Sequence, residues 1–122
     1  MKSCSNEYQN EHKKRVEEAK ENVLDGRILG KMCSLLKVLG EPSRMKIALA
    51  LLNGELCVYH IVDAVGGNQS AVSHQLRILK DSGAISSRRE GQNILYSIAD
   101  SHVREIIEVA KAHAYCESES NV

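Results

Sequence analysis

Residues 68–83, NQSAVSHQLRILKDSG, carry the clearest structural signal in the chain. Asn68 is a favourable N-cap residue, and Gly83 suits the position just after a helix because glycine accepts a left-handed backbone. Three apolar residues between them recur at the i, i+4, i+7 spacing of a buried helical stripe: Val72, Leu76 and Leu79. The stretch therefore predicts an amphipathic helix from about residue 69 to residue 82.

The segments on either side of this helix decide the fold class. A short apolar helix is expected over residues 56–65, and Gly66 and Gly67 break it to form a tight turn. Two extended segments follow, at 85–89 and 93–98, and the apolar-polar alternation of the second predicts a β-hairpin. A helix-turn-helix followed by a hairpin predicts a mainly α chain with a β-hairpin wing, the winged helix-turn-helix.

The rest of the chain is expected to be helical and to form one domain with a polar arm. Apolar spacing and helix-stop residues predict further helices at 28–39, 42–53 and 100–116, and a charged, solvated helix at 11–25. The expected organisation is an N-terminal polar arm at 1–24, a winged-helix DNA-binding and dimerisation domain at 25–117, and a disordered tail at 118–122.

Composition limits the classes of protein that fit. The 122 residues carry 16 basic and 16 acidic side chains, and this zero net charge argues against a non-specific nucleic-acid binder. No apolar run approaches the ~20 residues of a membrane span, so a cytoplasmic protein with no membrane partner is expected. Four cysteines without a CxxC pair are expected to be thiols or metal ligands rather than disulfides.

The outward face of the 69–82 helix is a candidate DNA-reading surface. Hydroxyl, imidazole and guanidinium groups there can reach phosphates and base edges in a major groove. Any amphipathic helix has a polar face, but the preceding turn and the basic hairpin favour binding to double-stranded DNA. The expected DNA-binding residues are Gln69, Ser70, Ser73, His74 and Arg77 on the helix, with Arg88 and Arg89 on the hairpin.

Four segments of the chain closely resemble one known family. LKVLGEPSRMKIALAL, ELCVYHI, QSAVSHQLRILKDSGAI and RREGQNILYSIAD resemble the ArsR/SmtB family of metal-responsive repressors, and the resemblance runs from about residue 25 to residue 116. It implies a homodimer that binds an imperfect inverted repeat of operator DNA in the apo state and leaves the DNA when metal binds.

The last predicted helix combines an apolar stripe with metal-binding residue types. The stripe, expected to pair with its symmetry mate, contains Val103, Ile106, Ile107, Ala110 and Ala114. His102 and His113 lie along one edge, ~16 Å apart along the axis, so they need two antiparallel helices to share an ion.

That pairing would unite Asp100 and His102 of one subunit with His113 and Cys116 of the other. The four positions match the zinc site of the C-terminal helix in the family that the chain resembles, except that the family usually has Glu or His where this chain has Cys116. Four such ligands suit tetrahedral Zn²⁺, and the thiolate extends the choice to Cd²⁺, Co²⁺ or another divalent ion, with Glu117 beside Cys116 as a further donor.

A second, weaker constellation lies at the start of the predicted 56–65 helix. Cys57 and His60 are three residues apart, and Cys4 and His12 are available on the N-terminal arm. Some members of the family bind a softer metal in this region. The alternative is that Cys57 is simply a small buried residue and His60 a surface residue.

Two other functions compete with metal sensing. A winged-helix repressor that senses redox state through its thiols is the main alternative, although the chain lacks closely spaced cysteines. An enzyme is not expected, since the chain has no phosphate-binding loop, no HExxH and no Ser-His-Asp order.

Overall fold

The computed structural model describes residues 6–23 and 25–120. The chain divides into two units, Met1–Cys33 and Ser34–Val122, and each is considered by itself. In the first, α1 (Asn6–Val23) begins earlier than predicted, and all of its residues are exposed, as expected for a solvated helix. Helix α2 (Gly26–Leu39) begins in the first unit and ends in the second.

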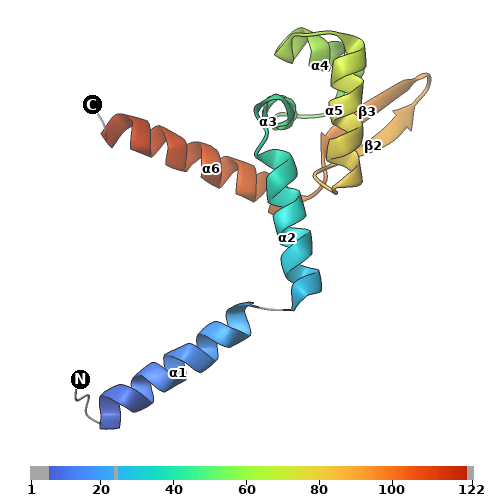
Figure 1. The fold of residues 1–122 in the computed structure, drawn as a ribbon. Helices are drawn as coiled ribbons and strands as arrows, with labels where there is room; N and C mark the ends of the chain where they lie inside the picture. The colour runs from blue at the N-terminus through green and yellow to red at the C-terminus, as the bar shows by residue number, and fades with distance from the viewer. Residues whose placement is uncertain (1–5, 24, 121–122) are drawn as a thin grey trace. The chain divides into compact units, whose positions relative to one another are not determined.

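Three short helices and a small sheet form the body of the second unit (Figure 1). Helix α3 (Pro42–Ala50) has proline in its first turn, where a missing N–H costs nothing, and it ends three residues before the predicted end. Helices α4 (Val58–Val65) and α5 (Gln69–Asp81) follow, separated by a turn in which both glycines have positive φ.

The beginning of α4 differs from the prediction. Leu56 and Cys57 form a short strand, β1, instead of the first helical turn. They pair with Tyr96 and Leu95 of a strand that follows α5, so a distant partner supplies their backbone hydrogen bonds. The local periodicity of 56–65 could not reveal this pairing, because it depends on residues nearly forty positions away.

The predicted helix after Asn68 is confirmed as α5. The Asn68 side-chain oxygen accepts a hydrogen bond from the Ala71 N–H at 2.9 Å, which is the expected N-cap arrangement. The predicted inward stripe is buried in the core (Val72, Leu76, Leu79). It meets buried residues of the other helices and the sheet, among them Leu39, Ile47, Leu51, Ile61, Ile85 and Ile98.

The predicted hairpin is also confirmed. Strands β2 (Ile85–Glu90) and β3 (Asn93–Ile98) are antiparallel, and Gly91 turns the chain with a φ of 62°. The sheet order is β1-β3-β2, and Figure 1 shows α5 lying against the hairpin. A helix-turn-helix followed by this hairpin is a winged helix-turn-helix, the fold class predicted from the sequence.

The C-terminal helix, α6 (Ser101–Ser120), is only partly covered by the rest of the second unit. Val103 and Ile107 are buried in the core, and the remainder of the helix extends away from it in Figure 1. The helix continues through 118–120, where the sequence predicted a disordered tail. Within the described ranges, no helix is both long enough and apolar enough to cross a membrane.

Candidate functional site

The outward face of α5 presents the polar residues that the sequence singled out. The inward stripe fixes the rotation of the helix, so the residues on its opposite face point to solvent. Five side chains are exposed there: Gln69, Ser70, Ser73, His74 and Arg77. Within the described chain, none of the five side chains makes an ion pair or a side-chain hydrogen bond.

Arg44 of α3 connects α5 to the neighbouring helices through side-chain hydrogen bonds. Arg44 donates from Nε to the Val38 carbonyl at 2.8 Å and from Nη1 to Gln75 Oε1 at 3.2 Å. One guanidinium therefore joins the end of α2, the start of α3 and the middle of α5. Arg44 was not predicted from the sequence, because its hydrogen-bond partners are six and 31 residues away and no local pattern points to them.

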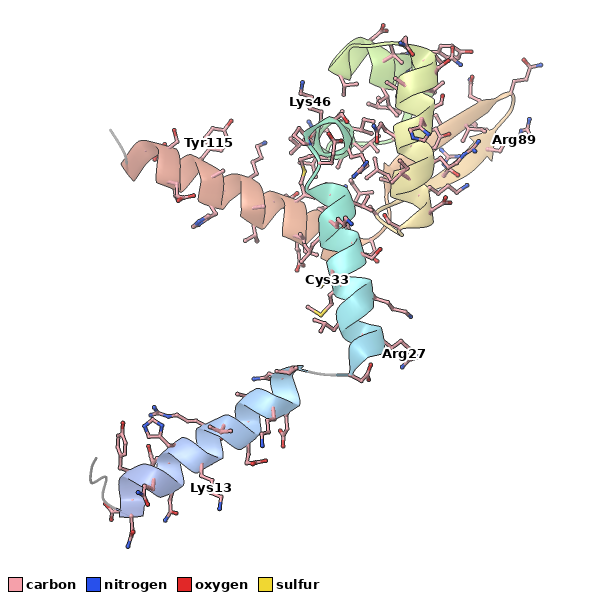
Figure 2. The ribbon with its side chains drawn as sticks, viewed as in Figure 1. Lys13, Arg27, Cys33, Lys46, Arg89 and Tyr115 are labelled. Carbon is pink, nitrogen blue, oxygen red and sulfur yellow. The ribbon has the colours of Figure 1, made fainter. Side chains whose placement is uncertain are left out.

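The two arginines of the hairpin have different surroundings. Arg88 makes a bidentate pair with Glu55, with two N···O distances of 2.7 Å, and a further contact of 2.8 Å with Glu90. Arg89 donates to the Gly91 carbonyl at 3.3 Å and makes no ion pair in the described part of the chain. In Figure 2, Arg89 projects from the side of the hairpin.

These contacts change the titration of the groups involved. The hydrogen bonds from Arg88 hold the pKa of Glu55 below its usual value, and the two carboxylates raise the pKa of Arg88 above its already high value. Glu55 and Arg88 are therefore both ionised at neutral pH.

The four predicted metal ligands of α6 fall into two separated pairs. His102 and His113 line a single open groove on the surface of the helix, together with Glu105, Ile106, Val109 and Ala110. His102 Nδ1 lies 3.9 Å from Asp100 Oδ1, and His113 Nε2 lies 3.5 Å from Glu117 Oε2. Among the described residues of one chain, no group of three or more ligand side chains comes close enough to hold a metal ion.

The predicted apolar stripe of α6 is divided between two environments. Ile107 is 1% exposed and belongs to the core of its own chain, as does Val103, whereas Ile106 is 36% exposed. Val109, which the sequence analysis did not include, is 66% exposed and lies between the two histidines. The spacing from His102 to Val109 to His113 is i, i+7, i+11, so helical periodicity could have identified it.

The second predicted constellation is present only as a pair. Cys57 Sγ lies 3.5 Å from His60 Nδ1, because the strand-to-helix junction places both at the start of α4. On α1, the ring of His12 packs against that of Tyr8 in a tilted arrangement, with centroids 4.2 Å apart. Cys4 lies outside the described residues. Cys33, on α2, is exposed.

Comparison with known proteins identifies the family. Residues 41–87 match the family described as bacterial regulatory protein, arsR family. The chain is also 41% identical over 91 residues to the HTH-type transcriptional regulator NmtR of Mycobacterium tuberculosis, covering 75% of this chain and 76% of NmtR. The chain belongs to the arsR family.

Other relatives of this arsR-family chain have names that refer to metals or repression. It is 36% identical over 96 residues to a cadmium resistance transcriptional regulatory protein CadC homolog of Staphylococcus aureus, covering 78% of this chain and 74% of that protein. It is 35% identical over 102 residues to a transcriptional repressor SmtB homolog of Synechocystis, covering 84% and 77%.

Solved structures of the family share the fold. The homodimeric winged helix-turn-helix DNA-binding domain Mb0332 of Mycobacterium bovis matches with a TM-score of 0.74 at 29% identity, over 80% of this chain and 93% of that one. The solution structure of apo-NmtR matches with a TM-score of 0.64 at 40% identity, over 75% and 77%. The family resemblance predicted from the sequence is therefore confirmed.

Proposed function

We propose that this arsR-family protein is a homodimeric transcriptional repressor that binds an inverted repeat of operator DNA and releases it when a divalent metal binds. One observation carries the metal part of the proposal. His102 and His113 line a single exposed groove on α6, separated by the apolar residues Ile106 and Val109. An apolar strip that ends in a histidine on each side suits a helix that pairs with a second copy of itself.

Exposed apolar surface on α6 supports the proposed dimer. Ile106 and Val109, which line the same groove, are 36% and 66% exposed. Contiguous exposed apolar surface on a small protein marks an interaction site. An antiparallel pairing of two α6 helices would cover this strip and bring His102 of each subunit toward His113 of the other.

The residues at the ends of the groove fit a divalent metal ion. Asp100, His102, His113 and Cys116 supply one carboxylate, two imidazoles and one thiolate, a donor set that accommodates Zn²⁺ and, through the thiolate, Cd²⁺ or Co²⁺. When bound, the ion would supply a bond between the two subunits at each end of the interface. The His113–Glu117 contact makes Glu117 an alternative to Cys116 as the fourth donor.

The chain itself connects this helix to the DNA-binding unit. Arg104, two residues after the candidate ligand His102, donates from Nη1 to the Leu52 carbonyl at 2.6 Å, and Leu52 lies two residues after the end of α3. Val103 and Ile107 pack in the same core as α5. A change in the pairing of the two α6 helices would therefore be carried to the α5 helices and alter their spacing. Coupling of this kind is typically about 1–3 kcal/mol.

Selection from random DNA tests the DNA-binding part of the proposal. The apo-protein, incubated with a library of random 30-base-pair duplexes, is expected to enrich sequences that contain an inverted repeat, because two α5 helices related by a two-fold axis read two equivalent half-sites. Enrichment of no sequence over the starting library would contradict the proposal.

Substitutions on α5 test which residues read the sequence. Ser73→Ala or His74→Ala is expected to lower the ratio of operator to random-DNA affinity about 5- to 150-fold, since losing a base contact costs ~1–3 kcal/mol. Lys80→Ala, in the last turn of the same helix, is a control for the loss of a polar surface residue. An unchanged ratio in both test variants, measured by competition binding, would show that another surface reads the bases.

Cobalt spectroscopy tests the donor set on α6. The Co²⁺-loaded protein is expected to show the ligand-field bands of tetrahedral cobalt and a thiolate charge-transfer band, and Cys116→Ser is expected to remove the charge-transfer band. Cys57→Ser serves as the matched control and is expected to retain it. A band that survives Cys116→Ser and disappears in Cys57→Ser would move the metal site to the start of α4.

A further inference from the structure

The solvent-facing side of the small sheet holds a charged cluster that crosses all three strands. Arg88 lies in β2, and its guanidinium reaches Glu55, the residue directly before β1. The intervening strand, β3, lies between them in the sheet order β1-β3-β2. The Arg88 side chain therefore passes over β3 and joins the two outer edges of the sheet.

The strand register explains why these residues meet. Arg88 and Cys57 both have Leu95 of β3 as their partner, so the three side chains share one face of the sheet. Glu55 precedes Cys57 by two residues and Glu90 follows Arg88 by two, which places both carboxylates on that same face. The Arg88 and Glu55 side chains together span the two strand separations, roughly 10 Å, that divide β2 from β1.

Arg89 lies on the other face of the same sheet. Its neighbours on that face, two and four residues earlier in β2, are Ser87 and Ile85, and Ile85 is buried in the core beneath α5. The two adjacent arginines therefore point to opposite sides of the hairpin. Only Arg89 is on the side of α5, whose outward residues are proposed to enter the DNA.

The charged neighbours of the two arginines also distinguish Arg88 from Arg89. Arg88 is flanked by two carboxylates, with three N···O contacts of 2.7–2.8 Å, whereas Arg89 makes no ion pair among the described residues. Isolated surface ion pairs contribute little to stability, but bidentate arginine-carboxylate pairs within a network are the exception. A phosphate approaching Arg88 would also have to approach Glu55 and Glu90.

We propose that Arg88 is a positioning residue that anchors the hairpin through Glu55, and that Arg89 is the residue of the hairpin that contacts the DNA backbone. This proposal rests on the proposed DNA-binding function. It assigns to Arg88 a role different from the phosphate contact expected from its sequence alone, and it gives Glu55 a function in DNA binding without contact with DNA.

The sign of the effect of Glu55→Gln tests this proposal most sharply. Removing a negative charge near a DNA-binding surface would tighten binding if only electrostatics mattered. Loss of the anchor is instead expected to weaken operator binding about two- to five-fold, the range that follows from the strength of a surface ion pair. Arg88→Gln is expected to weaken binding to the same extent, and the double variant no further, because the two residues act as a unit. Tighter or unchanged operator binding by Glu55→Gln would overturn the proposal.

Salt dependence separates a phosphate contact from an anchor. Arg89→Gln is expected to reduce the slope of log K against log salt by about one, because one released counterion is lost, whereas Arg88→Gln keeps the wild-type slope. Arg88→Lys keeps the charge without the bidentate geometry and is expected to restore only part of the affinity. A slope reduced by about one in Arg88→Gln and unchanged in Arg89→Gln would reverse the two assignments.

Amide hydrogen exchange without DNA keeps this test independent of the proposed function. Exchange in β2 and β3 is expected to rise about two- to five-fold in Glu55→Gln and in Arg88→Gln, and to stay at the wild-type rate in Arg89→Gln. If the wild-type protein bound no DNA, the proposed function and the Arg89 contact would both fail. Unchanged exchange in Glu55→Gln and Arg88→Gln would overturn the anchor itself.

Discussion

Replacing His102 with alanine is expected to leave DNA binding by the apo-protein intact and to abolish its release by metal. His102 is exposed on α6 and is not part of the outward face of α5, so its removal should disturb neither the fold nor the DNA contact. For the wild-type protein, a coupling of ~1–3 kcal/mol corresponds to an affinity loss of about 5- to 150-fold in the presence of metal. In His102→Ala, the same measurement should change less than about two-fold, because one of four ligands is missing.

His60→Ala is the matched control for this experiment. His60 is also exposed, and it contacts Cys57 at the alternative metal site. It is expected to behave as wild type when operator affinity is measured with and without zinc. If His102→Ala still left the operator on zinc addition and His60→Ala did not, the sensing site would lie at Cys57 and His60.

Glutamate substitutions at two adjacent residues of α6 are expected to have different consequences. Ile107 is buried in the core of its own chain, so Ile107→Glu would place an unpaired carboxylate there and should unfold the protomer. Ile106 is on the exposed strip, so Ile106→Glu should leave the protomer folded and place like charges in the proposed interface. Sedimentation is therefore expected to find a monomer for Ile106→Glu, with the wild-type helical content by circular dichroism.

The matched control lies on the same helix. Lys111→Glu also introduces a carboxylate, at a position outside the groove that His102 and His113 line, and it is expected to remain a dimer. A dimer of wild-type strength in Ile106→Glu would place the interface on another surface.

The fold was largely predictable because its main helices and strands have clear local sequence signals. Asn68, the Val72-Leu76-Leu79 stripe and Gly83 define α5 within sixteen residues, and Gly91 with the alternating β3 defines the hairpin. Strand β1 was missed because its two residues are extended only through pairing with Tyr96 and Leu95. An apolar pair at the start of a helical pattern gives no sign of a distant strand.

The candidate site was predictable in its residue types but not in its surroundings. Helical spacing placed His102 and His113 on one edge of α6, and both do line one groove. The same spacing could not separate Ile107, which packs in its own core, from Ile106, which does not. Adjacent arginines in a strand also look alike in sequence, and only the sheet register and Glu55 distinguish Arg88 from Arg89.

Titration of the operator complex with zinc is the decisive test of metal-driven release from DNA. A fluorescently labelled operator duplex, taken from the random-library selection, is bound by the apo-dimer at fixed ionic strength, and its anisotropy is followed as zinc is added. The anisotropy is expected to fall to the value of free DNA as one zinc per protomer is bound, and a chelator is expected to restore the complex. An anisotropy that stays at the bound value through an excess of zinc over protomer would contradict metal-driven release.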